Sequence, residues 1–142
     1  MPTGITMLTR IMLGIMLVFL AAAGVSAQDE EKSFTAMVDP DGVQRVEVLG
    51  GNYYFNPNVI VVKINKPVEL KIRSDGGITP HNIVLKAPEA GIDFVENLDS
   101  EAKIIRFTPT RLGRYPFECD HRFLFFASHK EQGMHGVLDV VQ

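Results

Sequence analysis

Apolar and polar residues alternate over short stretches along most of the chain, which is the period of strands rather than of helices. The clearest case is residues 68–73, where apolar and charged side chains alternate strictly, as on a strand with one buried face. Residues that favour chain reversal, mainly Pro, Gly and Asn, separate these stretches. The pattern predicts about eight short strands: 34–38, 43–49 continued by 53–55, 59–64, 68–73, 81–85, 102–107, 114–119 and 137–141.

Residues 87–100 interrupt this regularity, because neither a helical nor a strand period continues through them. We expect a long excursion there, with one helical turn. Short strands joined by turn residues, with no long helical pattern, predict a single all-β domain of the Greek-key β-sandwich class.

The first 27 residues have the pattern of a signal peptide. Arg10 is their only charge, an apolar run covers residues 11–25, and Val25-Ser26-Ala27 ends in a small-x-small cleavage pattern. The run is short for a membrane span, which needs about 20 apolar residues. We therefore expect cleavage after Ala27, a mature domain of residues 28–142, and a periplasmic or otherwise exported protein with no membrane attachment; the alternative is an uncleaved anchor.

Composition limits the classes of partner. The leader carries one of the 14 basic residues and none of the 17 acidic ones, which leaves the mature domain with a net charge of −4. This charge argues against nucleic acid and is compatible with a protein partner that has a basic face. With one cysteine, the exported chain has no internal disulfide, so Cys119 is either a metal ligand or a buried, unreactive thiol.

Candidate chemistry is concentrated in residues 119–136, which contain the only cysteine, three of the four histidines, and Met134. The fourth histidine, His81, begins a predicted strand upstream. A thiolate, two imidazoles and a thioether are the ligand set of a blue-copper site. Cys119 ends a strand with its side chain on the face shared by Tyr115 and Phe117, so the sulfur points into one rim of the sandwich.

Two histidines compete for the place beside Cys119. His129 stands five positions before Met134, and Gly133 allows the tight turn that would bring both to one ion. His121 is nearer to Cys119 in sequence but would need a sharp bend of the chain. Surface exposure is the ordinary explanation for whichever histidine does not bind, and for His135.

Four segments carry a resemblance to a known family: Y-F-N-P-N-V-I-V-V-K-I-N-K-P-V-E-L-K-I, P-H-N-I-V-L, G-R-Y-P-F-E-C and S-H-K-E-Q-G-M-H-G-V-L-D-V. Over residues 50–142 the chain resembles the cupredoxins, the plastocyanin and azurin family. The resemblance implies a copper ion held by His81, Cys119 and His129 in a plane, with Met134 as a weak axial ligand, and Asn82 steadying the cysteine sulfur. It further implies single-electron transfer, for which we expect a redox partner protein. No substrate pocket or acid–base pair is legible in the sequence, so we do not expect an enzyme.

One departure from the family pattern concerns the spacing between the cysteine and the second histidine. Nine residues separate Cys119 from His129, a longer interval than the family usually has, and they include His121 and the apolar run 123–126. That run either covers the core or forms a docking surface beside the metal. A second cysteine is missing from the loop, which argues against a binuclear copper centre. Copper delivery or tolerance without electron transfer, and a metal-free assembly domain, remain as alternative functions.

Overall fold

The computed structural model describes residues 31–122 and 127–142, so the expected leader and the apolar run 123–126 lie outside the described residues. Its elements in chain order are β1 (Ser33–Thr35), β2 (Gln44–Gly51), β3 (Tyr54–Asn56), β4 (Val59–Lys63), β5 (Val68–Ser74), β6 (His81–Ala87), the 3₁₀ helix η1 (Pro88–Ala90), β7 (Ile92–Leu98), β8 (Lys103–Phe107), β9 (Gly113–Glu118) and β10 (His135–Val141). Within this part of the chain, no helix has the length and hydropathy of a membrane span.

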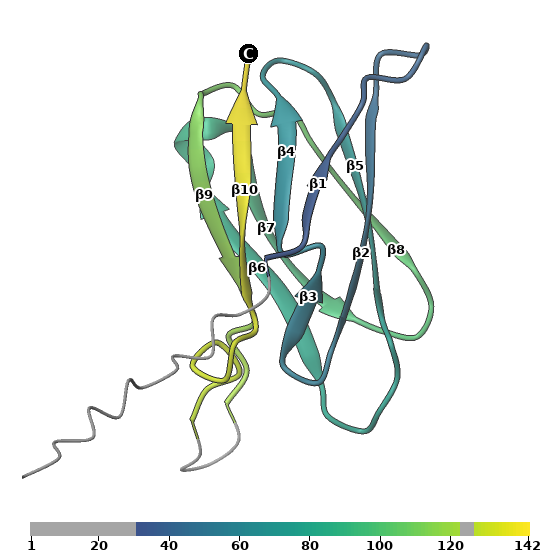
Figure 1. Cartoon of the computed structure of the whole chain (residues 1–142), viewed down its shortest axis with the longest axis vertical. Helices are drawn as coiled ribbons and strands as arrows, with labels where there is room; N and C mark the ends of the chain where they lie inside the picture. Colours follow the sequence, from purple (N-terminus) through teal and green to yellow (C-terminus); the bar gives the residue numbers. More distant parts are fainter. Residues whose placement is uncertain (1–30, 123–126) are drawn as a thin grey trace, which may run out of the picture.

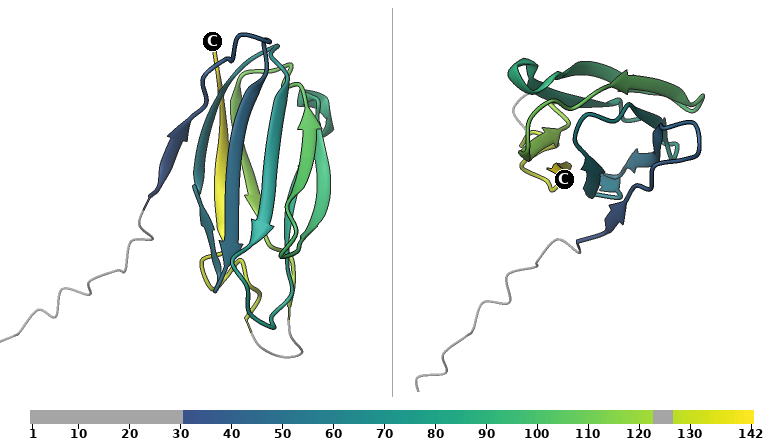
Figure 2. Two further views of the ribbon diagram at one scale, coloured as in Figure 1. Left: turned by 90° about the vertical axis from the view of Figure 1, so that its right-hand side faces the viewer. Right: turned by 90° about the horizontal axis from the view of Figure 1, so that it is seen from above.

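The strands form two sheets that pack face to face (Figures 1 and 2). One sheet has six strands in the order β1-β4-β10-β9-β6-β7, and the other has four in the order β3-β2-β5-β8. Both sheets are mixed, because β4 runs parallel to β1 and β10, and β2 runs parallel to β5. The all-β sandwich predicted from the alternating pattern is confirmed.

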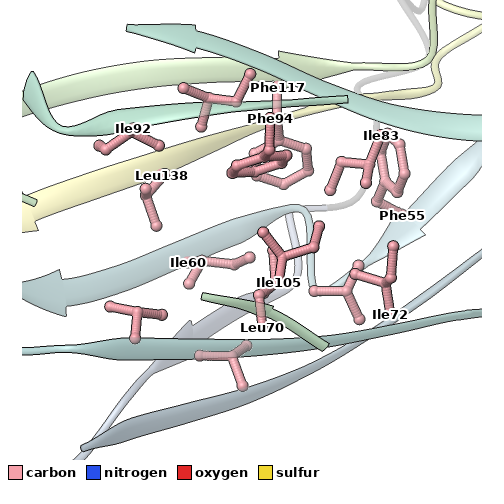
Figure 3. Packing of buried hydrophobic residues seen from close by; sticks show 14 of the residues in the cluster. Phe55, Ile60, Leu70, Ile72, Ile83, Ile92, Phe94, Ile105, Phe117 and Leu138 are labelled. Atoms are coloured by element: carbon pink, nitrogen blue, oxygen red, sulfur yellow. The ribbon is translucent and has the colours of Figure 1, made fainter. Parts of the chain in front are cut away.

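Alternation along the strands places the core between the sheets. On β5, Val68, Leu70 and Ile72 are buried while the charged residues between them face outward. Side chains from both sheets meet in the same layer (Figure 3), where the rings of Phe55 and Phe117 lie edge to face with centroids 5.2 Å apart. Burial of one such large apolar side chain stabilises the fold by about 1.5–3 kcal/mol. Packing of these apolar side chains between the sheets therefore stabilises the sandwich.

Strand β7 is the main difference from the predicted elements, because it occupies most of the expected excursion. The helical turn expected there is η1, and a seven-residue strand follows it. Ile92, Phe94 and Leu98 are its buried residues. The alternation is hidden in the sequence because Glu96 stands where an apolar residue is expected, while Val95 is half exposed. Pairing with β6 along its whole length makes this stretch a strand despite its irregular pattern.

Strand directions bring the candidate ligands to one end of the sandwich. Strand β9 runs antiparallel to both β6 and β10, so its end lies beside their starts. His81 is the first residue of β6, Cys119 follows β9, and Met134 precedes β10. The loop between β9 and β10, drawn yellow-green in Figure 1, lies at this end of the molecule. The fold thus joins residues that are far apart in sequence.

Candidate metal centre

Three potential ligand atoms meet at this end of the sandwich. His81, Cys119 and His129 are buried, and one ligand atom from each lies within 4.8 Å of the others. The two Nδ1 atoms are 3.1 Å apart, and Sγ of Cys119 is 3.4 Å from Nδ1 of His129. The cluster joins the start of β6, the end of β9 and the loop before β10.

A tight turn brings His129 back to the sandwich. The backbone N–H of Met134 donates to the carbonyl of His129 at 2.9 Å, and Gly133 between them has a φ of 104°. Few residues other than glycine adopt that left-handed backbone. The N–H of Cys119 donates to the carbonyl of Met134 at 3.0 Å, which extends the β9–β10 ladder beyond the strands. These backbone hydrogen bonds hold His129 and Cys119 beside Met134.

Burial sets the protonation of the cluster. It lowers the pKa of His81, with further lowering by His129 and His121, and it lowers the pKa of His129, with a further contribution from His121. Both imidazoles are therefore neutral at pH 7, the form that binds metals. Burial also raises the pKa of the Cys119 thiol, although the backbone N–H groups of Asn82 and His121 oppose this effect. The sulfur stays protonated unless a cation stabilises the thiolate.

The spacing of the ligand atoms fits a transition-metal ion. Nitrogen and sulfur ligands about 2.0–2.3 Å from a common ion lie about 3–4 Å from one another. The observed separations of 3.1 and 3.4 Å agree with this requirement. Two imidazole nitrogens that face each other can share only one proton, whereas a cation satisfies both lone pairs and the sulfur. The chemistry of this donor set, two imidazoles and a thiolate, suits copper.

Asn82 holds the cysteine end of the site. Its backbone N–H points at Sγ of Cys119, 3.5 Å away. Its side chain makes two hydrogen bonds with Asp120: the amide donates to Oδ1 at 2.7 Å and accepts from the Asp120 N–H at 3.0 Å. The residue that the resemblance associates with the cysteine sulfur therefore ties β6 to the chain directly after Cys119.

Replacing Asn82 with alanine tests this contact. Asn82→Ala leaves the Asp120 N–H without its partner, so we expect the free energy of unfolding to fall by about 1–3 kcal/mol. We also expect the absorption band of the copper-loaded protein to shift, because the strand bearing His81 is no longer tied to the cysteine loop. Denaturant unfolding and visible spectroscopy measure the two effects.

A matched asparagine lies directly opposite on the neighbouring strand. Asn97 pairs with Asn82 in register but is exposed. Asn97→Ala should change the free energy of unfolding by no more than about 0.5 kcal/mol and leave the spectrum unchanged. Equal effects of the two substitutions would contradict the role given to Asn82.

Tyr53 is a residue of the site that the sequence analysis missed. Its ring lies edge to face on both imidazoles, with centroids 4.9 Å from His129 and 6.0 Å from His81. Its φ of 63°, after 43° at Asn52, is uncommon for a bulky side chain and costs roughly 1–2 kcal/mol. The G-G-N break before it signals an unusual backbone, but a contact with two distant histidines has no local signal.

The remaining candidate residues lie around the cluster. The ring centroid of His121 is 6.2 Å from that of His129, and its carbonyl accepts the His129 N–H at 3.0 Å, but its side chain is not among the clustered ligand atoms. His135 is exposed at the start of β10. Met134 is fully buried and packs toward Gly50. Its role as an axial ligand stays a prediction.

Comparison with known proteins agrees with this geometry. The chain matches the sequence model of a family described as a cupredoxin-like domain over residues 10–138. The chain therefore belongs to the cupredoxin-like family, whose members bind copper, and its His81–Cys119–His129 cluster could hold the ion. A comparison with curated protein sequences found no match.

Several solved structures share the fold. The metal-binding domain of the Cu(I)-exporting ATPase CopA of Streptococcus pneumoniae, solved with Cu(I), has a TM-score of 0.59 and 22% identity, over 80% of this chain and 100% of that one. Auracyanin of Roseiflexus castenholzii has a TM-score of 0.54 and 19% identity, over 69% and 97%. Auracyanin A, a "blue" copper protein of Chloroflexus aurantiacus, has a TM-score of 0.51 and 18% identity, over 70% and 100%. At these identities the similarity is evidence of fold only.

Proposed function

We propose that the protein is an exported electron carrier with one type 1-like copper ion. His81, Cys119 and His129 are its equatorial ligands and Met134 is its weak axial ligand. The observation that carries this proposal is the preformed cluster: three ligand atoms lie within 4.8 Å of one another, all in buried residues. A site fixed by the sandwich requires little movement when the charge of the ion changes.

Each residue has a defined part in this function. Cys119 gives up its proton on binding and provides a soft thiolate, which suits Cu(I), while the neutral imidazoles suit both oxidation states. Burial excludes water from the ligands, and Asn82 and Tyr53 hold the cysteine loop and the imidazoles in place. When bound, copper supplies the one-electron redox couple. We therefore propose an electron carrier and not an enzyme.

Copper titration of the purified exported protein tests the proposal. We expect one equivalent to bind, with a thiolate-to-Cu(II) absorption band in the visible region and an electron-spin spectrum of a single Cu(II) site. Repeated reduction and oxidation should restore the band without loss of metal. Failure to bind copper would favour the metal-free assembly domain, whereas binding without reversible cycling would favour the second candidate below.

Copper delivery or tolerance without electron transfer is the second candidate. The observation that favours it is a cavity of about 570 Å³ that reaches His129. A site open to ion exchange serves delivery better than a closed one. Rapid transfer of Cu(I) to an acceptor, together with no electron exchange with a redox partner, would decide in its favour.

Export and partner choice complete the proposal. The apolar leader and its small-residue exit support cleavage after Ala27, and the mature net charge of −4 supports a redox partner with a basic face. We expect mass spectrometry of exported material to give a mature N-terminus at Gln28. Recovery of the protein with residues 1–27 attached would instead support the anchor.

A further inference from the structure

The buried cluster raises the question of how an ion reaches it. Cys119 and Met134 are fully buried, and His81 and His129 are 4% and 3% exposed. None of these side chains presents a ligand atom freely to solvent, so an ion must pass between other residues first. Two cavities lead to the cluster from outside: one of about 570 Å³ is lined by His129, and one of about 420 Å³ is lined by His81.

His121 lies at the boundary of both cavities. Among the described residues, the two share four lining residues, which are Ile78, Thr79, Pro80 and His121. Among these four, His121 alone has a side chain that binds Cu(I) well, because an imidazole is a copper ligand and the others offer at most a hydroxyl. His121 therefore stands beside the clustered ligands on both approaches, with His129 in one cavity and His81 in the other.

One ring nitrogen of His121, Nε2, is a buried polar atom. It is buried and makes no hydrogen bond within the part of the chain that the structure describes. An unsatisfied buried polar atom is unfavourable, so a binding partner there is favourable. The ring centroid is 6.2 Å from that of His129, and the His121 carbonyl accepts the His129 N–H, so the two residues are fixed beside each other.

We propose that His121 is a transit ligand, which binds Cu(I) on its way into and out of the buried cluster. This inference rests on the copper site proposed above. The transfer is a ligand exchange with no change of oxidation state. Nε2 of His121 replaces one ligand of the incoming carrier, and Nδ1 of His129 and Sγ of Cys119 then replace His121, with the thiol proton passing to solvent. The carrier's chemistry is that of a Cu(I) chelate.

A pair of substitutions of equal size separates ligation from packing. His121→Leu removes the ligand, whereas His121→Met provides a thioether, which binds Cu(I), in a side chain of similar volume. The measurement is the rate at which an excess of a water-soluble Cu(I) chelator removes the ion from the loaded protein, together with the rate of the reverse transfer. His135→Leu, which removes an exposed histidine outside both cavities, is the control.

We expect His121→Leu to slow both rates about tenfold or more, which corresponds to a barrier raised by about 1.4 kcal/mol. The equilibrium affinity should not change, because both directions slow equally. The Cu(II) spectrum should not change, because His121 is not a ligand of the ion once it is in the cluster. His121→Met and His135→Leu should exchange at nearly the wild-type rate. Equal slowing by the leucine and methionine variants, or unchanged rates in both, overturns the transit role.

The same experiment distinguishes this inference from the proposed function. If the wild-type protein takes up no Cu(I), the copper site itself fails and the transit role fails with it. If the wild-type protein takes up Cu(I) and His81→Ala loses it, while His121→Leu exchanges at the wild-type rate, only the transit role fails. A fall in equilibrium affinity in His121→Leu would make His121 a resident ligand and would also overturn the inference.

Discussion

The substitution Cys119→Ser should remove the intense visible absorption of the Cu(II)-loaded protein. That absorption requires a bond between Cu(II) and a thiolate, and the chain contains one cysteine. The sulfur lies 3.4 Å from Nδ1 of His129 within the three-residue cluster, so its removal takes away the only soft anionic ligand of that cluster. Absorption spectra at one equivalent of Cu(II), before and after substitution, measure the loss.

Folding of the variant is the necessary control. Serine is close to cysteine in size, and its hydroxyl can still accept the backbone N–H of Asn82, which is 3.5 Å from the sulfur in the native protein. Cys119 belongs to the buried core, but the other core side chains are unchanged. We therefore expect the strand signal in circular dichroism to match that of the wild type. A folded Cys119→Ser protein that keeps the full absorption band would rule out the proposed site.

The fold was predictable wherever one face of a strand is buried. Residues 68–73 alternate strictly because Val68, Leu70 and Ile72 fill the core while their neighbours face solvent. β7 was missed because Glu96 and Val95 reverse the alternation in its middle, and its pairing with β6 is a long-range interaction that the local pattern cannot show. The alternation of apolar and polar residues alone therefore identifies strands that have one face exposed to solvent. It fails on irregular edge strands.

The candidate site was partly predictable for a similar reason. Metal-binding side chains are few and have characteristic spacing, so the sequence identified His81, Cys119 and His129, and the structure brings these three together. Tyr53 carries no such chemistry, and its place over the imidazoles depends on how the β2–β3 turn meets the loop before β10. The apolar run 123–126, which could cover the core or form a docking surface, lies outside the described residues.

Replacing each of the two competing histidines should give opposite results. We expect His129→Ala to lose or grossly alter the spectrum of the copper-loaded protein and to weaken copper binding at equilibrium. His121→Ala should leave the spectrum and the equilibrium affinity nearly unchanged. Titration with Cu(II), followed by absorption and electron-spin spectroscopy, measures both properties in the two variants and the wild type.

The geometry favours His129 over His121 as the second imidazole ligand. Its Nδ1 lies 3.1 Å from that of His81 and 3.4 Å from the cysteine sulfur, so it contacts both other members of the cluster. His121 is closer to Cys119 in sequence, but its side chain is not among the clustered ligand atoms. The Met134 N–H donates a hydrogen bond to the His129 carbonyl and closes a turn. This turn brings the His129 side chain to the cluster although His129 is farther from Cys119 in sequence. The reverse result, with His121 essential and His129 dispensable, would overturn this assignment and leave membership of the cupredoxin-like family unaffected.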